Sequence, residues 1–356
     1  MDAPLETRNL EVDQSGSVST HALATAMGRV PIWLFTWLVL FLLSLTVALP
    51  WYKWFQGVVG NNYEPGAISA FLDNTFRWDN RGGLDTMNRA TAQSGAMIAF
   101  LSILFGVFFA GGWLQVFLER TRGQSLRRFF FGGARYFWRF LRVLILTLLI
   151  LAVFGWLVYD PPFQETVLGS WLGVPAKDHS ELESLDSEGT FFAIRAGQSA
   201  VFALLFALTL TWADYTRTRL ALQDTHSAIW SGLQTFFTML RHPIRTLRPM
   251  LILLLAEALV VFAFAWGVQW LEQGFLSVDG EIPTAGPMRV WVIGILSQFA
   301  LMWRAIIRGA RYHATARVSH EIVRPLSRPD PWRESIGGPG GPRYPLEEGD
   351  EYGVAL

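Results

Sequence analysis

Long apolar runs alternate with polar segments along most of the chain. A hydrocarbon core about 30 Å thick is crossed by about 20 residues of apolar α-helix, and six runs reach that length. The sequence therefore predicts an all-α fold, a polytopic membrane helical bundle of six transmembrane helices. The predicted spans lie near residues 31–50, 95–118, 141–159, 191–212, 249–270 and 290–307.

Polar sequence flanks this membrane domain, which we expect over residues 31–323. Residues 1–30 form a cytoplasmic N-terminal segment, and residues 324–356, rich in Pro, Gly and acid, lack the apolar content to fold. We interpret the latter as a disordered cytoplasmic tail. Between the spans, Ala67–Trp78 predicts a short amphipathic helix on the membrane surface, and Asp178–Glu188 predicts a solvated acidic loop.

The composition excludes most other classes of protein. Hydrophobic residues make up 51% of the chain and charged residues only 16%, against about a quarter charged in soluble domains. The absence of cysteine excludes disulfides, thiolate nucleophiles and iron–sulfur clusters.

The charged residues predict the orientation of the chain. Two segments between spans (119–142 and 213–248) and the segment at and after the end of the last span (304–333) together carry 19 Arg against five acids, while the alternate loops carry six basic residues against 14 acids. Basic loops stay on the cytoplasmic side of a membrane. We therefore expect a multi-pass protein of the bacterial cytoplasmic (inner) membrane with the N-terminus and the C-terminus both cytoplasmic.

Two of the basic segments predict cytoplasmic amphipathic helices, one before span three and one before span five. Helical spacing places several Arg on one face, between aromatic residues, as in helices that lie in a membrane interface. Gly132-Gly133 is expected to interrupt the first of these helices and let it bend. The Arg residues that we expect to contact lipid phosphates are Arg128, Arg135, Arg139, Arg142, Arg241, Arg245 and Arg248. The alternative, that these residues only determine the topology, explains them as well.

The two basic segments also share a pattern that suggests an internal repeat. Arg120-Thr121-Arg122 follows span two and Arg217-Thr218-Arg219 follows span four. Each is followed, after a spacer, by the pattern R-x-x-x-R-x-L-R, and then by an apolar run. Two explanations fit this pattern. One is a duplication of a unit made of a span, a basic segment and a second span; the other is a chance match in an Arg-rich chain.

Polar residues at membrane depth are the next candidates for function. Glu257 lies eight residues into span five, about 12 Å from its cytoplasmic end. One reading makes it a proton or cation carrier with Gln298 or Arg304 as partner; the other makes it a hydrogen-bonded structural residue. Gln198 in span four is a further intramembrane polar residue. Asp214 is expected to pair with Arg217 or to face water.

The chemistry of a catalytic site is missing from the sequence. No histidine falls inside a predicted span, and no Walker loop, G-x-S-x-G turn or metal-ligand spacing occurs. We therefore expect no catalytic residues, no metal, no cofactor and no nucleic-acid partner, and a protein that is not an enzyme.

Two regions of the sequence carry a resemblance to a known family. They are Ala110-Gly111-Gly112 with Gln124–Phe130 and Gly133–Arg142, and Ala213–Leu220 with Asp224 and Arg241-His242-Pro243. Residues 20 to 323 resemble an uncharacterised family of six-span bacterial integral membrane proteins, and are more loosely similar to the membrane domains found beside glycerophosphodiester phosphodiesterases. The resemblance implies the six-span fold and no particular activity.

Three hypotheses for the function follow. The first is a non-catalytic membrane subunit or scaffold, in contact with the lipid bilayer and anionic phospholipid headgroups and with a protein partner in a membrane complex. The second is a small proton- or cation-coupled permease that uses Glu257 and Gln298. The third is a lipid-headgroup enzyme at the cytoplasmic face, with Asp214 and the Arg residues as its candidates.

Overall fold

A computed structural model describes residues 17–62, 74–118, 125–159, 188–273 and 287–322 of the chain. The chain divides into two units, Met1–Val323 and Arg324–Leu356, and all the described residues belong to the first. The expected amphipathic helix at Ala67–Trp78 falls largely outside these residues; the structure describes only the part of it that lies in α4, Asn74–Asp79. The acidic run falls almost wholly outside them, and the expected disordered tail falls entirely outside them.

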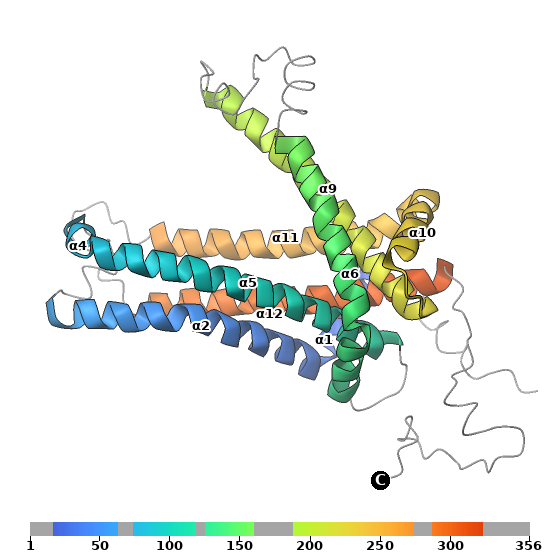
Figure 1. The fold of residues 1–356 in the computed structure, drawn as a ribbon, viewed down its shortest axis with the longest axis horizontal. Coiled ribbons are helices and arrows are strands. Elements are labelled where there is room, and N and C mark those ends of the chain that lie inside the picture. Colours follow the sequence, from blue (N-terminus) through green and yellow to red (C-terminus); the bar gives the residue numbers. More distant parts are fainter. Residues whose placement is uncertain (1–16, 63–73, 119–124, 160–187, 274–286, 323–356) are drawn as a thin grey trace, which may run out of the picture. The chain divides into compact units, whose positions relative to one another are not determined.

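The described residues are helical throughout, apart from short turns and caps (Figure 1). Six of the helices are long and apolar enough to cross a membrane, as the hydrophobic pattern predicts. The six are α2 (Val30–Asn62), α5 (Arg81–Leu118), α6 (Ser125–Tyr159), α9 (Glu188–Gln223), α11 (Pro243–Gln273) and α12 (Pro287–Ile322).

Two shorter helices, α1 (Val18–Met27) and α10 (Ala228–Arg241), complete the packed part of the chain. α1 lies in the segment before the first span and packs on α12, where its Ala22 and Ala26 are fully buried beside Ile307 and Ala310. The residues before the first span therefore contribute to the core.

The two predicted amphipathic helices fare differently. The helix expected before span three is not a separate element, because α6 runs without a break from Ser125 through the apolar stretch to Tyr159. Before span five a separate helix, α10, precedes the span, but it ends at Arg241, so the other Arg residues of the predicted amphipathic helix, Arg245 and Arg248, lie in α11. Ser227 caps α10 by accepting a hydrogen bond from the backbone N–H of Trp230 (3.3 Å), and Pro243 opens α11 after the break at His242.

The prediction that Gly132-Gly133 interrupts its helix is wrong. Both glycines lie inside α6 where it crosses α5 in close contact: Gly132 faces Gly111 and Gln115 of α5, and Gly133 faces the ring of Phe108. A Cβ added to Gly132 would lie 2.2 Å from Cβ of Gln115 and 2.7 Å from the carbonyl oxygen of Gly111. These glycines therefore provide space for a second helix rather than freedom to bend.

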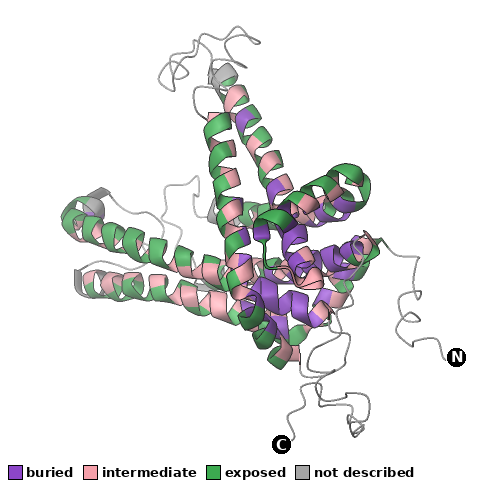
Figure 2. Cartoon of the chain, turned by 45° about the vertical axis from the view of Figure 1, so that its right-hand side comes forward, coloured by how far each residue is buried: buried purple, intermediate pink, exposed green. Residues whose placement is uncertain are grey.

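Buried residues gather toward the same end of several helices (Figure 2). They occupy the last part of α5, the first half of α6, the last part of α9 and the second half of α12, together with α1. These are the helix parts next to the Arg-rich segments. At the opposite ends, large apolar side chains such as Trp266, Trp270 and Trp291 are exposed, as is expected for surfaces that face lipid.

Candidate functional site

Five charged side chains from α9, α11 and α12 form a continuous chain of ion pairs inside the packed end. The order is Arg304, Glu257, Arg311, Asp214, Arg217, with the charges alternating in sign. We call these five residues the charged cluster. It links three of the six long helices through side chains alone.

Asp214 is the most buried charge of the cluster, with only 2% of the residue exposed. Arg217, one turn further along α9, donates to Oδ1 (3.0 Å), and Arg311 of α12 donates to Oδ2. Both carboxylate oxygens are therefore bound by guanidinium groups. The expectation that Asp214 pairs with Arg217 agrees with the structure, whereas the pairing with Arg311 was not predicted.

Glu257 of α11 is bound in the same way from two positions of α12. Arg304 Nε donates to Oε1 (3.0 Å) and Arg311 donates to Oε2 (3.4 Å). Gln298, one of the two partners considered for Glu257, instead accepts a hydrogen bond from the indole N–H of Trp37 (3.2 Å). The structure therefore does not bring Glu257 and Gln298 together as a pair.

Gln198 lies apart from the charged cluster. Its side-chain amide donates to the carbonyl of Val158 at the end of α6 (3.4 Å). A buried side-chain amide that bonds a backbone carbonyl on a neighbouring helix stabilises helix packing, so the geometry of Gln198 is that of a contact between α6 and α9.

Hydroxyl groups surround the cluster on the side of α9 and α12. Thr218 and Thr315 share a hydrogen bond (3.0 Å), and Arg217 donates to the hydroxyl of Tyr312 (3.4 Å). The Nε atoms of Arg217 and Arg311 are buried without a hydrogen-bond partner. Among the described residues each oxygen of the two carboxylates thus accepts a hydrogen bond from Arg, whereas some N–H donors of the cations are left without an acceptor.

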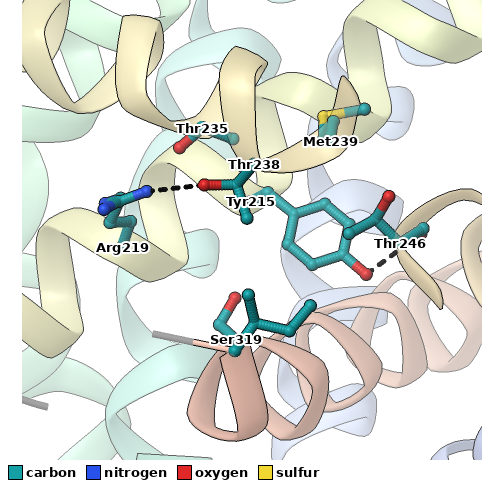
Figure 3. A pocket seen from close by; sticks show the side chains of 8 residues that line it. Tyr215, Arg219, Thr235, Thr238, Met239, Thr246 and Ser319 are labelled. Atoms are coloured by element: carbon teal, nitrogen blue, oxygen red, sulfur yellow. Dashed lines mark hydrogen bonds between the residues drawn. The ribbon is translucent and has the colours of Figure 1, made fainter. Parts of the chain in front are cut away.

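A small cavity lies next to the cluster, between α9, α10, α11 and α12 (Figure 3). Tyr215 donates its hydroxyl to the carbonyl of Thr246 (3.0 Å), and Arg219 donates to the hydroxyl of Thr238 (3.1 Å). The cavity volume of about 10 Å³ is room for about one water molecule. It is too small for a substrate, and its side chains join α9 to α10 and α11.

Of the seven Arg residues predicted to contact lipid, most are exposed, and some bind other groups of the protein. Arg135, Arg142, Arg241, Arg245 and Arg248 are exposed, whereas Arg128 and Arg139 are half-buried. Arg139 pairs with Asp224 in the turn between α9 and α10, and Arg142 donates to the carbonyl of His226 in the same turn (3.2 Å). Part of this Arg set therefore holds the turn against α6.

Asp224 adopts a left-handed backbone conformation (φ 47°), which Asp tolerates better than most residues. Burial alone would raise the pKa of its carboxyl. The hydrogen bond and charge of Arg139, helped by Arg135 and His226, outweigh burial and lower the pKa below its ordinary value. Asp224 is thus held ionised where three helices meet.

The residue that sequence reasoning missed is Arg311. The predicted sixth span ended near residue 307, so the Arg residues beyond it were counted as loop charges. α12 instead continues to Ile322. Arg304, Arg308 and Arg311 are spaced four and three residues apart, which places them on one helix face. This helical spacing, together with the small residues Ala305 and Ala310, was the sequence signal that the helix continues past residue 307.

The described residues contain no group of three His, Asp or Glu side chains that could hold a metal ion. Comparison with known proteins adds no assignment: no protein-family model, no curated protein and no solved structure matches the chain. The resemblance to a six-span bacterial family therefore stays a prediction, and the function has to be argued from the geometry.

Proposed function

We propose that the chain is a non-catalytic membrane subunit or scaffold whose basic end contacts anionic phospholipid headgroups in the cytoplasmic leaflet of a bacterial inner membrane. The observation that carries the proposal is a group of exposed Arg residues where α10 ends and α11 begins: Arg241 is the last residue of α10, and Arg245 and Arg248 lie in the first turns of α11. Within the described residues none of the three forms an ion pair with an acid. We call this group the basic rim.

The basic rim follows directly on an exposed apolar helix face. α10 buries its small and polar residues, Ala228, Ser231, Gly232 and Thr235, against the rest of the protein. Its outward side chains are large and apolar, including Ile229, Trp230, Leu233, Phe236, Phe237 and Leu240. A helix with this arrangement beside basic residues is suited to the boundary between acyl chains and headgroups.

The charged cluster supports the non-catalytic part of the proposal. A general base must lie within hydrogen-bond reach of the proton that it removes, and Asp214, only 2% exposed, is closed off from any substrate by its Arg partners. Both oxygens of Asp214 and both oxygens of Glu257 already accept hydrogen bonds from Arg. Their geometry is suited to joining helices.

Extraction with a styrene–maleic acid copolymer tests the proposal, because it keeps the surrounding lipid with the protein. The full chain is purified in this form and its lipids and proteins are identified by mass spectrometry. We expect enrichment of anionic phospholipid over the bulk membrane and at least one co-purifying protein. Each Arg near an anionic surface contributes about 1 kcal/mol, so the triple variant Arg241→Gln/Arg245→Gln/Arg248→Gln should lower the lipid enrichment severalfold.

The matched control is Arg89→Gln, since Arg89 is also exposed but lies in the opposite part of α5 from the packed end. It should leave the enrichment unchanged. Bulk lipid composition around the unmodified chain, together with no co-purifying protein, would overturn the proposal.

A further inference from the structure

α11 and α12 pack side by side and leave an open groove between them on the far side of Glu257 from the basic rim. The groove has a volume of about 300 Å³. Its walls are apolar, with Phe264, Ala265 and Val268 from α11 and Ala300 and Leu301 from α12. Arg304 is the one charged residue that lines it.

Arg304 keeps hydrogen-bonding capacity that the protein does not use. Its side chain is 55% exposed, and its only ion pair runs from Nε to Glu257. Within the described residues, its two terminal nitrogens donate no hydrogen bond. A guanidinium in this state can bind a phosphate through two parallel N–H donors.

The charge balance around Arg304 also favours an anion. The charged cluster contains three Arg and two acids. Arg308, one turn beyond Arg304 on α12, forms no ion pair with any described acid, but it does not line the groove and its guanidinium lies beside Gly106 of α5. Positive charge at membrane depth is costly without a counter-charge, so the one unbalanced Arg of the charged cluster favours an anion at its exposed member, Arg304.

The groove runs from Arg304 toward the apolar ends of both helices. Its lining extends over eight residues of α12, from Arg304 back to Ser297, and over eight of α11, from Val261 to Val268. At 1.5 Å per residue each wall is about 10 Å long. A phosphate held at Arg304 therefore directs an attached acyl chain along the apolar walls.

We infer that this groove binds an anionic phospholipid, with one acyl chain between α11 and α12 and the phosphate on the Arg304 guanidinium. The inference rests on the proposed function for the class of ligand, but it uses none of the basic-rim residues. It differs from general lipid contact because it requires one retained molecule of an anionic lipid at a defined place.

The test measures how many phosphatidylglycerol molecules stay bound to the full chain after detergent washing. The chain is reconstituted in phosphatidylcholine nanodiscs that contain phosphatidylglycerol, transferred to detergent and analysed by native mass spectrometry. The unmodified chain should retain one phosphatidylglycerol in preference to phosphatidylcholine. Ala300→Phe fills the groove and leaves every charge in place, so retention should fall at least fivefold. Arg304→Gln should lower the retention by a similar factor. Arg304→Lys keeps the charge and should lower the retention less.

The matched control for groove filling is Ile295→Phe, since Ile295 is exposed on α12 and does not line the groove. It should retain lipid as the unmodified chain does, and thermal unfolding should show that Ala300→Phe folds. Unchanged retention in folded Ala300→Phe, or equal retention of phosphatidylcholine, would overturn the groove site.

The basic-rim triple variant separates the two proposals. It should lower the total phosphatidylglycerol enrichment while keeping the one retained molecule. If the rim variant lowers enrichment and Ala300→Phe has no effect, the groove site alone is wrong. If neither variant changes phosphatidylglycerol binding, the proposed function is wrong as well.

Discussion

At the scale of single residues, Arg311 connects the two buried acids. It pairs with Asp214 of α9 and Glu257 of α11 from one position on α12, and only 8% of its side chain is exposed. Removing one partner from a buried ion pair costs about 3–5 kcal/mol, because the remaining charge stays buried without compensation. Arg311→Met should therefore lower the thermal unfolding temperature strongly, as measured by Trp fluorescence in detergent.

A control on the same helix separates burial from charge. Arg317 and Glu321 are 3.9 Å apart, with 60% of the Glu321 side chain exposed, and exposed pairs contribute about 1 kcal/mol or less. Arg317→Gln should therefore have little effect on the thermal unfolding temperature.

A double variant tests the direct pairing of Arg311 with Asp214. Because Asp214→Asn removes the charge that Arg311 neutralises, the double variant Asp214→Asn/Arg311→Met should be less destabilised than the sum of the single variants. Additive losses would contradict a direct pairing.

Asp224 gives a pH-dependent prediction at the same scale. Its pKa is lowered in the folded chain, so its ion pair with Arg139 stabilises the fold above the unfolded pKa, about 3.9 for Asp, and this stabilisation is lost as the pH falls through the folded pKa. Asp224→Asn keeps the left-handed turn and should abolish this acid-side loss, while costing less than about 1 kcal/mol at neutral pH because the carboxylate is partly exposed. Acid unfolding curves that stay identical for the two proteins would contradict this role.

At the scale of helices, the crossing of α5 and α6 depends on glycine. A Cβ at Gly132 would meet a backbone carbonyl and the Cβ of Gln115, neither of which can move without shifting a helix. We expect Gly132→Ala to destabilise the protein by about 1–3 kcal/mol, although alanine is the better helix former. Gly95→Ala in α5 meets nothing within 4 Å and should be neutral or stabilising. Thermal unfolding of both variants checks this, and equal stability would contradict the close crossing.

The crossing of α5 and α6 also shows which features of the fold could be predicted from the sequence. Long apolar runs are enough to predict six membrane helices, because few other structures satisfy so much apolar backbone in lipid. Gly132-Gly133 was misread because a glycine pair permits either a bend or a close helix contact, and the choice depends on a partner helix. The predicted sixth span ended before the end of α12 for a related reason: Arg311 looks like a loop charge until Asp214 and Glu257 are known to pair with it.

At the scale of the whole molecule, the formal net charge of zero hides a separation of charge along the helices. The Arg-rich segments adjoin the helix ends where buried residues gather and where the charged cluster joins α9, α11 and α12. The acidic and neutral loops join the opposite ends. The packed end and the basic end are therefore the same end of these helices. If basic loops remain in the cytoplasm, the core, the charged cluster and the basic rim all lie toward the cytoplasmic side.

This orientation can be measured directly because the chain contains no cysteine. A single cysteine introduced by Ser180→Cys, in the loop between α6 and α9, should react with a membrane-impermeant maleimide on intact spheroplasts. Gly123→Cys, between α5 and α6, should react only after the membrane is permeabilised. A membrane-permeant maleimide should label both variants, which shows that each thiol is reactive. The reverse pattern would place the basic rim and the Arg304 end of the groove in the outer leaflet, where the cytoplasmic anionic surface that the proposed function requires is absent.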